Sequence, residues 1–266
     1  MASHATISVY IIETALIFFI LLKIIQARQG KELYIRRISG LNAIDEAVGR
    51  CTEMGKPLLY CFGMTGFGIT GLQSLAIMSH VTKRSAVYGS RIICAYSDSL
   101  LLAAGDEVTR EAYEESGVPE LYDPENSKYL SDNQFAYTSA VVGLTHREKP
   151  ASVIYMGFFA GEALILTENG QQQGAIQIAG TPETIQVPFF LASCDYTIIG
   201  DEYYAAAAYL SREPTMLGSL AGQDLGKATL ILYILAGTLV FTLTALGIDN
   251  SFLEFCTRIL FYYNGD

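Results

Sequence analysis

Two long apolar stretches near the ends of the chain constrain its fold more than any other feature. Residues Ile7 to Ile25 include only two charged side chains, Glu13 and Lys23, and Ala228 to Ile248 include none. An α-helix of about 20 residues is long enough to cross the ~30 Å hydrocarbon core of a bilayer. We therefore expect two transmembrane helices, and we expect the lipid bilayer to be a partner of the chain.

The first stretch has an alternative interpretation as a signal peptide. Such a peptide has a basic start and a small-residue cleavage site. Here the leading MASHATIS has neither Lys nor Arg, and the apolar run continues into Lys-Ile-Ile-Gln-Ala-Arg. We therefore interpret the stretch as an uncleaved membrane anchor.

The distribution of basic residues predicts the orientation in the membrane. Lys227 precedes the second stretch, and a larger basic group follows the first, made up of Lys23, Arg28, Lys31, Arg36 and Arg37. Basic residues near spans remain on the cytoplasmic side. We expect a protein of the cell (inner) membrane, with a cytoplasmic central domain and both termini outside.

Glu13 lies within the first apolar stretch, where an ionisable side chain is costly. Its carboxylate could extend to the outer interface, or it could make an intramembrane polar contact with another helix. A proton path is a third interpretation.

Composition excludes several classes of protein. The chain is 51% hydrophobic and only 17% charged, whereas intrinsic disorder requires low hydrophobicity and high charge. A formal net charge of -10 disfavours a nucleic-acid partner, because phosphate backbones attract basic surfaces. Five cysteines with no C-x-x-C pair argue against a disulfide framework and a zinc ribbon.

Between Gly40 and Gly218, short apolar runs alternate with amphipathic stretches. Strands are expected at Pro57–Phe62, Arg91–Tyr96, Ser152–Phe158 and Ala175–Ala179. Helices are expected at residues 41–54, 71–88, 99–116 and 132–148, then up to residue 167 and over 184–210, with a loop at 117–128. This alternation predicts an α/β domain with a Rossmann-like, mostly parallel sheet and helices on both faces, flanked by the two transmembrane helices.

The expected domain organisation has four parts. They are an N-terminal transmembrane helix at 1–27, a cytoplasmic α/β domain with its tethers at 28–226, a second transmembrane helix at 227–249 and an amphipathic tail at 250–266. The tail has a helical apolar stripe formed by Phe252, Leu253, Cys256, Ile259, Leu260 and Tyr263.

One glycine motif suggests a ligand site. The segment Gly66-Phe67-Gly68-Ile69-Thr70-Gly71 matches G-x-G-x-x-G after a predicted strand and at the start of a predicted helix, the context that pyrophosphate binding requires. Asp98, at the end of the next strand, could bind a ribose hydroxyl. The candidate cofactor-binding residues are thus Gly66, Gly68, Gly71 and Asp98. The alternative is a plain glycine-rich loop, and no cofactor other than a nucleotide is indicated.

Support for catalysis or metal binding is thin. His80 and His146 lie inside predicted helices, and the chain has no G-x-S-x-G motif. Asp98, Glu162 and Glu183 follow predicted strands and could converge on a metal, although carboxylates in such positions also cap helices. We therefore name no catalytic or metal-binding residue and lean towards a protein that is not an enzyme.

Four segments together resemble a known family. They are Ile35–Ala47 (IRRISGLNAIDEA), Asp132–Tyr137 (DNQFAY), Gly174–Thr181 (GAIQIAGT) and Tyr209–Pro214 (YLSREP). The family is an uncharacterised prokaryotic, membrane-associated domain of unknown function, and the likeness extends from about Tyr34 to Lys227. The resemblance implies a prokaryotic membrane protein with an α/β domain between two membrane segments, and it implies no catalytic residues.

Two functions are compatible with these features. The first is a non-catalytic, membrane-anchored scaffold or assembly subunit that forms a homo-oligomer or part of a larger membrane complex. Small residues in the second apolar stretch, Ala236, Gly237 and Gly247, would favour close helix packing. The second is a membrane-tethered domain, sensory or enzymatic, that binds a nucleotide or another small molecule.

Overall fold

The computed structural model describes residues 7–31 and 39–246 of the chain. These residues form two compact units. One is an α/β unit within Arg36–Ser211, and the other is a pair of helices from the segments on either side of it. We describe each unit separately.

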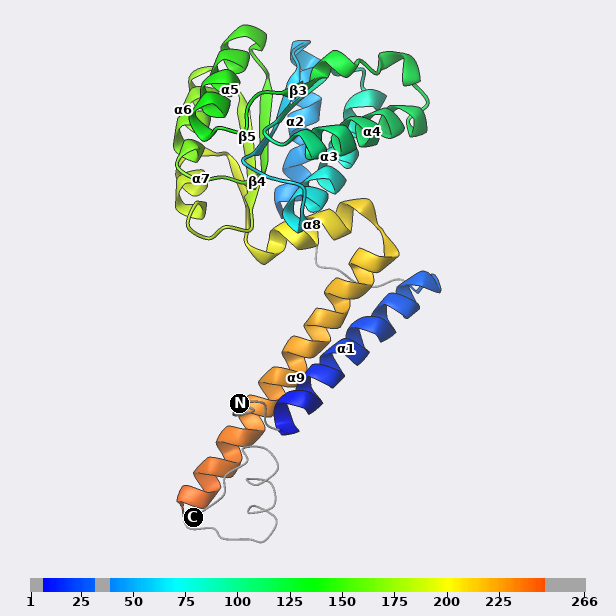
Figure 1. Cartoon of the computed structure of the whole chain (residues 1–266), viewed down its shortest axis with the longest axis vertical. Helices are drawn as coiled ribbons and strands as arrows, with labels where there is room; N and C mark the ends of the chain where they lie inside the picture. The colour runs from blue at the N-terminus through cyan, green and yellow to red at the C-terminus, as the bar shows by residue number, and fades with distance from the viewer. Residues whose placement is uncertain (1–6, 32–38, 247–266) are drawn as a thin grey trace. The chain divides into compact units, whose positions relative to one another are not determined.

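In the described part of the α/β unit, six parallel strands form one sheet in the order β3-β2-β1-β4-β5-β6 (Figure 1). The strands are β1 (Leu58–Gly63), β2 (Ile92–Tyr96), β3 (Ser127–Tyr129), β4 (Ser152–Phe158), β5 (Ile176–Thr181) and β6 (Tyr196–Ile199). This is the strand order of the doubly wound Rossmann fold. The predicted Rossmann-like α/β fold is confirmed.

Helices cover both faces of this sheet. One face carries α2 (Ser39–Met54), α3 (Ile69–Val87), α4 (Ser99–Glu115) and α8 (Asp201–Ser211), and the other carries α5 (Gln134–Glu148), α6 (Glu162–Gln172) and α7 (Val187–Ser193). Successive residues of a strand point to opposite faces. In β1, Tyr60 and Phe62 therefore belong to the first core, and Leu59 and Cys61 to the second.

The sequence analysis missed two strands, which are the two edges of the sheet. β3 lies in the segment that we expected to be a loop, and its Ser-Lys-Tyr sequence has no apolar run. β6 lies within the expected helix at 184–210, which instead forms α7, β6 and α8. A signal for β6 was present, since the β-branched Thr197, Ile198 and Ile199 precede a glycine at 200 with a φ of 56°.

The second unit pairs α1 (Ile7–Arg28) with α9 (Pro214–Ala245) through a stripe of glycines. Gly218, Gly222 and Gly226 recur every four residues. A Cβ atom at Gly222 would lie 2.5 Å from Ile20 Cα, and one at Gly218 would meet Ile24 Cα. The helices therefore run antiparallel with their backbones in close approach, as in membrane helix pairs with small residues at their interface.

This geometry corrects the predicted tether before the second apolar stretch. We expected helix α9 to begin near residue 227, but it begins at Pro214, so only Arg212 and Glu213 separate it from α8. The glycine stripe lies in the segment that the sequence analysis assigned to the tether of the α/β domain. A run of three glycines at intervals of four was the signal in the sequence.

Among the residues described, α9 alone is long and apolar enough to cross a membrane, where the sequence predicted two such helices. In the observed register, Ile20 and Ile24 of α1 lie beside the first half of α9, which carries Asp224 and Lys227. The half of α1 around Ile20 and Ile24 is therefore level with the more polar first part of α9 and not with the apolar part that begins at Ala228. The expected amphipathic tail at 250–266 lies outside the described residues.

Candidate functional site

The carboxyl ends of β1 and β4 lie side by side at the centre of the sheet, where the strand order reverses. The chain leaves β1 for α3 on one face, and it leaves β4 for α6 on the other. In open α/β sheets, ligands bind in the crevice at such a switch point. We refer to the loops that follow the strands as the carboxyl edge, and to the opposite side of the sheet as the starting edge.

Hydrogen bonds connect the loops after β1 and β4. The Met64 N–H donates to Phe158 O at 2.9 Å, and the Phe158 N–H donates to Thr65 Oγ1 at 2.7 Å. Thr65 Oγ1 donates in turn to Phe62 O. These bonds hold the loops after β1 and β4 together at the switch point.

Gly63, the last residue of β1, is held by hydrogen bonds to a side chain of α5 and to one in the loop after β2. Its N–H donates to Tyr137 Oη at 3.1 Å, and its carbonyl accepts from Ser97 Oγ at 2.7 Å. With a φ of 64°, it has a backbone conformation that favours glycine, and a Cβ here would collide with Phe158 O. The sharp turn at the end of β1 therefore requires glycine.

The three glycines of the predicted motif differ in their surroundings. Gly66 and Gly68 have open space where a side chain would be, whereas a Cβ at Gly71 would lie 2.6 Å from Gly66 O. Gly68 is the N-cap of α3, and no described side chain caps that helix. The first N–H groups of α3 therefore lie beside a bare backbone loop, as anion binding by a helix N-terminus requires.

Asp98 takes the helix-capping role that the sequence analysis allowed for carboxylates after strands, and its contact with a ribose hydroxyl stays a prediction. Its carboxylate accepts a hydrogen bond from the Leu101 N–H at 2.7 Å and caps α4. Asn133 caps α5 in the same way, through Phe135 N–H and Ala136 N–H. The helices that follow β2 and β3 thus have side-chain caps, but α3 and α6, which flank the switch point, both begin after glycines, Gly68 and Gly161, without one.

Glu162, the first residue of α6, is a buried carboxylate with an unsatisfied oxygen. Its side chain is 2% exposed. Oε2 accepts from Gln134 Nε2 at 2.5 Å, but no donor among the described residues reaches Oε1. A buried acceptor without a donor typically costs about 1–3 kcal/mol, and more when it is charged. The sequence analysis considered Glu162 only as a metal ligand or a helix cap, and nothing in the sequence pointed to Gln134 as its partner.

Tyr137 connects this region to the sheet. Its hydroxyl accepts from Gly63 N–H and donates to Ala95 O at 3.2 Å. Burial raises the pKa of Tyr137 well above its usual range, and Cys61 and Glu162 add to the effect. The phenol is therefore neutral and can hold both hydrogen bonds.

The carboxylates that follow the strands do not gather into a metal centre. Glu183 is exposed, Asp98 caps a helix, and the described residues contain no group of three or more metal-ligating side chains. Burial also raises the pKa of Cys94 to about 12, which leaves it a protonated, unreactive thiol.

Acidic and apolar side chains dominate the carboxyl edge. The loops that directly follow the described strands contain no Lys or Arg, but they contain Asp98, Asp132 and Glu183. Large apolar side chains are exposed along the same edge, namely Phe67 (54%), Ile69 (72%), Leu100 (67%), Phe135 (75%), Phe158 (40%) and Ile185 (74%). This edge therefore has the features of an interaction surface rather than of an ordinary polar rim.

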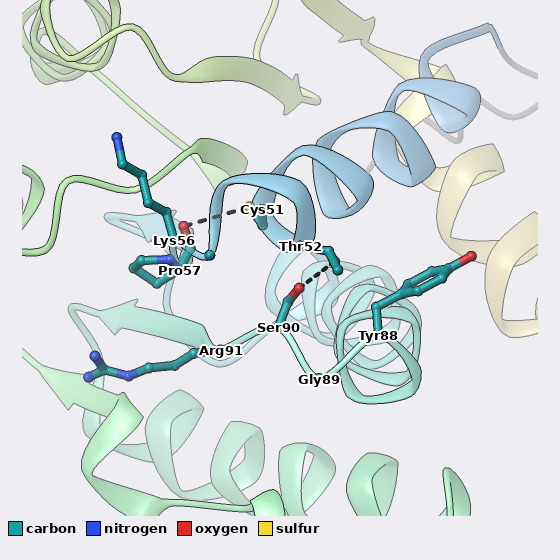
Figure 2. Close-up of a pocket in the computed structure, with 9 residues that line it drawn as sticks. Cys51, Thr52, Lys56, Pro57, Tyr88, Gly89, Ser90 and Arg91 are labelled. Carbon is teal, nitrogen blue, oxygen red and sulfur yellow. Dashed lines mark hydrogen bonds between the residues drawn. The ribbon is translucent and has the colours of Figure 1, made fainter.

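A cleft of about 300 Å³ lies on the starting edge, between the end of α2 and the turn from α3 to β2. Thr52 Oγ1 and Ser90 Oγ are hydrogen-bonded at 2.6 Å across it, and Arg91 is held by Asn126 and Glu148. Figure 2 shows Lys56, Tyr88 and Arg91 extending in different directions. Because its polar groups pair with one another instead of converging, this cleft is the weaker candidate.

Glu13 is exposed on α1, and no hydrogen bond or ion pair involves it within the described part of the chain. The intramembrane polar contact proposed for it is not made with α9 in this structure. A contact with another chain stays a prediction.

Comparisons with known proteins identify a family but no characterised relative. Residues 1–252 match the family described as a domain of unknown function, DUF6754. No curated protein and no solved structure matches the chain.

Proposed function

The chain belongs to the DUF6754 family, and we propose that it is a membrane-attached protein whose α/β unit binds a small molecule at the switch point of its sheet. One observation carries this proposal. The two helices that flank the switch point, α3 and α6, begin after Gly68 and Gly161 without a side-chain cap, while α4 and α5 are capped by Asp98 and Asn133. Open donor groups at a switch point favour a ligand.

A nucleotide is one form of this ligand. Gly66 and Gly68 leave space for a phosphate to approach the backbone, and Gly71 allows α3 to pack closely on the loop. Two features weigh against it. Asp98 Oδ1 already caps α4, and the loops of the carboxyl edge offer no Lys or Arg to a phosphate. Backbone donors would have to hold the phosphate alone.

Thermal-shift and calorimetric titrations of the full chain in nanodiscs with NAD, NADP, ATP and AMP test the nucleotide form. Gly68→Val should abolish nucleotide binding without unfolding the domain, because Gly68 has an extended backbone and open space around it. Gly143→Val, at an exposed glycine of α5 with equally open surroundings, is the matched control. Equal affinity of both variants would refute a role for the loop.

For the membrane arrangement, we propose that α9 crosses the bilayer and that α1 enters it as a second membrane segment, with the α/β unit in the cytoplasm and both termini outside. The exposed apolar side chains of the pair support contact with lipid, among them Ile17, Phe18, Leu21, Leu232, Leu235 and Leu239. The basic group that follows the first apolar stretch supports the orientation.

The native cysteines of the domain are poor reporters of this topology, because Cys51, Cys61 and Cys94 are buried. A cysteine introduced at the exposed Ser139 of α5 avoids this difficulty. In a chain with Cys256 replaced by serine, because the proposed topology places Cys256 outside, we expect a membrane-impermeant maleimide to label Ser139→Cys in broken cells but not in intact cells. Labelling in intact cells would reverse the proposed orientation.

A second candidate function is a self-associating scaffold. Two features support it, the exposed apolar side chains of the helix pair and Glu13, which has no partner among the described residues, since another copy could cover both. Mass measurement in mild detergent should then show a discrete homo-oligomer or a larger complex. A monomer in several mild detergents and in nanodiscs would exclude the scaffold and leave the binding function in place.

A further inference from the structure

We infer that the switch point recognises a primary or secondary ammonium group carried on an apolar molecule, with the Glu162 carboxylate as the acceptor. This inference rests on the proposed binding function, because it names the class of ligand for the same site. Three independent observations carry it, namely an unsatisfied buried oxygen, the charge of the surrounding loops and the aromatic residues beside them.

The first observation is the state of the Glu162 carboxylate. An ionised carboxylate can only accept hydrogen bonds, and Gln134 satisfies just one of its two oxygens. Glu162 is only 2% exposed, so bulk water does not reach Oε1 in this structure. The missing group is a hydrogen-bond donor, and an N–H on a cation is the strongest donor to a carboxylate.

The second observation is the charge of the loops that follow the described strands. They contain Asp98, Asp132 and Glu183 but neither Lys nor Arg. A rim with one sign of charge attracts ligands of the opposite sign. The carboxyl edge is therefore complementary to a cation and repels an anion.

The third observation is a set of exposed phenyl rings on the elements that meet here. Phe67 lies in the loop after β1, Phe158 ends β4, and Phe135 directly follows Gln134 in α5. An aromatic face attracts an ammonium group and also packs against an apolar chain or ring. These rings can therefore contact both parts of an apolar amine, whereas a nucleotide phosphate gains nothing from them.

Gly161 marks the approach to the carboxylate. It is exposed, and the one described atom near its missing side chain is Gln134 Nε2, 3.9 Å from where a Cβ would lie. A side chain at this position would therefore contact the Gln134 amide that pairs with Glu162. Its φ of -62° and ψ of -16° suit any residue, so a larger side chain would block the site without straining the backbone.

The test is calorimetric titration of the full chain in nanodiscs with 2-phenylethylamine and with 2-phenylethanol, which replaces the ammonium group by a hydroxyl. We expect the amine to bind at least ten times more tightly than the alcohol. Glu162→Gln should weaken amine binding at least tenfold, while it keeps an oxygen for Gln134. Gly161→Leu should weaken it as strongly, and Glu168→Gln, at an exposed carboxylate of the same helix, should leave it unchanged.

Four outcomes would overturn the inference, and they differ in what they say of the proposed function. Equal affinity for amine and alcohol, or unchanged amine binding by Glu162→Gln, removes the ammonium recognition but keeps a ligand site. Binding of NAD or AMP without any binding of the amine also removes the ammonium recognition and keeps a ligand site. If neither the amine nor any nucleotide binds the wild-type chain, both the inference and the proposed function fail. Circular dichroism of each variant separates lost binding from lost folding.

Discussion

The two edges of the sheet use glycine for different purposes. On the starting edge, helices end in turns with a left-handed residue, at Gly55, Gly89, Lys149 and Gly174, and the three glycines among them have open space around the missing side chain. At the switch point on the carboxyl edge, Gly63 and Gly157 also have positive φ, but a Cβ at either one would collide with the opposite loop. The starting edge needs only a backbone conformation, whereas the switch point also needs the space.

This difference indicates where the fold is specialised. Left-handed residues after helices are common turn chemistry and connect α to β in many proteins. Close approach of two loops at a switch point, with two helices uncapped and a carboxylate oxygen unsatisfied, has no such general explanation. Departures from local consistency are expected at functional sites.

The largest expected effect comes from placing alanine at a glycine of each edge. Gly63→Ala combines an unfavourable φ with a collision against Phe158 O, and we expect it to lower the free energy of unfolding by about 3 kcal/mol or more. Gly89→Ala has only the unfavourable φ and should cost about 1–2 kcal/mol. Urea unfolding followed by circular dichroism gives both values, and equal losses would refute the contrast between the edges.

Alkaline pH should act on the carboxyl edge through Tyr137. Its pKa is raised in the folded state, so the native protein holds this proton at pH values where the unfolded chain releases it. Stability is therefore full below about pH 10, the ordinary pKa of tyrosine, and falls as the pH rises further, by at most about 1.4 kcal/mol per pH unit for each such group. Tyr113, with a pKa raised to about 12, adds to the loss.

The measurement is urea unfolding between pH 8 and pH 11 for the wild type and for Tyr137→Phe. The variant should be less stable at pH 8, because Gly63 N–H and Ala95 O lose their partner, and its stability should depend less on pH. The same pH dependence in both proteins would show that Tyr137 does not carry the effect.

A smaller effect is expected from Lys149→Gly on the starting edge. Lys149 has a φ of 47°, which costs a residue with a side chain about 1–2 kcal/mol. Glycine removes this cost but gains flexibility in the unfolded chain, worth about 0.4–1 kcal/mol. A net stabilisation of about 0.5 kcal/mol should appear in thermal or urea unfolding, and a loss of stability would contradict the assignment of this edge to simple turn chemistry.

The sequence was sufficient for the central part of the fold. The buried strands β1, β2 and β4 have continuous apolar runs, β5 has a run interrupted only by Gln177, and those runs marked them correctly. It was insufficient for β3, an edge strand that needs no such run, whereas the β-branched run of β6 was present but was assigned to a helix. Pairing with Cys94–Tyr96 holds the polar Ser-Lys-Tyr of β3 in place, and no local pattern can encode that.

The candidate site was predictable in location but not in chemistry. Loops after parallel strands were expected to hold it, and Gly66, Gly68 and Gly71 do lie at the switch point. The capping of α4 by Asp98 is a local contact that the sequence analysis allowed for, whereas the pairing of Gln134 with Glu162 depends on tertiary geometry. In the helix pair, the glycines at 218, 222 and 226 were visible, but their interval of four acquires meaning only beside a second helix.

Hydrogen–deuterium exchange of the full chain in nanodiscs, with 2-phenylethylamine and separately with NAD, tests most directly whether the carboxyl edge is the binding site. A ligand that binds there should slow exchange in residues 63–71 and 158–164 and leave residues 51–57 and 88–91, which line the starting-edge cleft, unchanged. Slower exchange confined to the starting edge, or no change anywhere with either compound, would contradict the account.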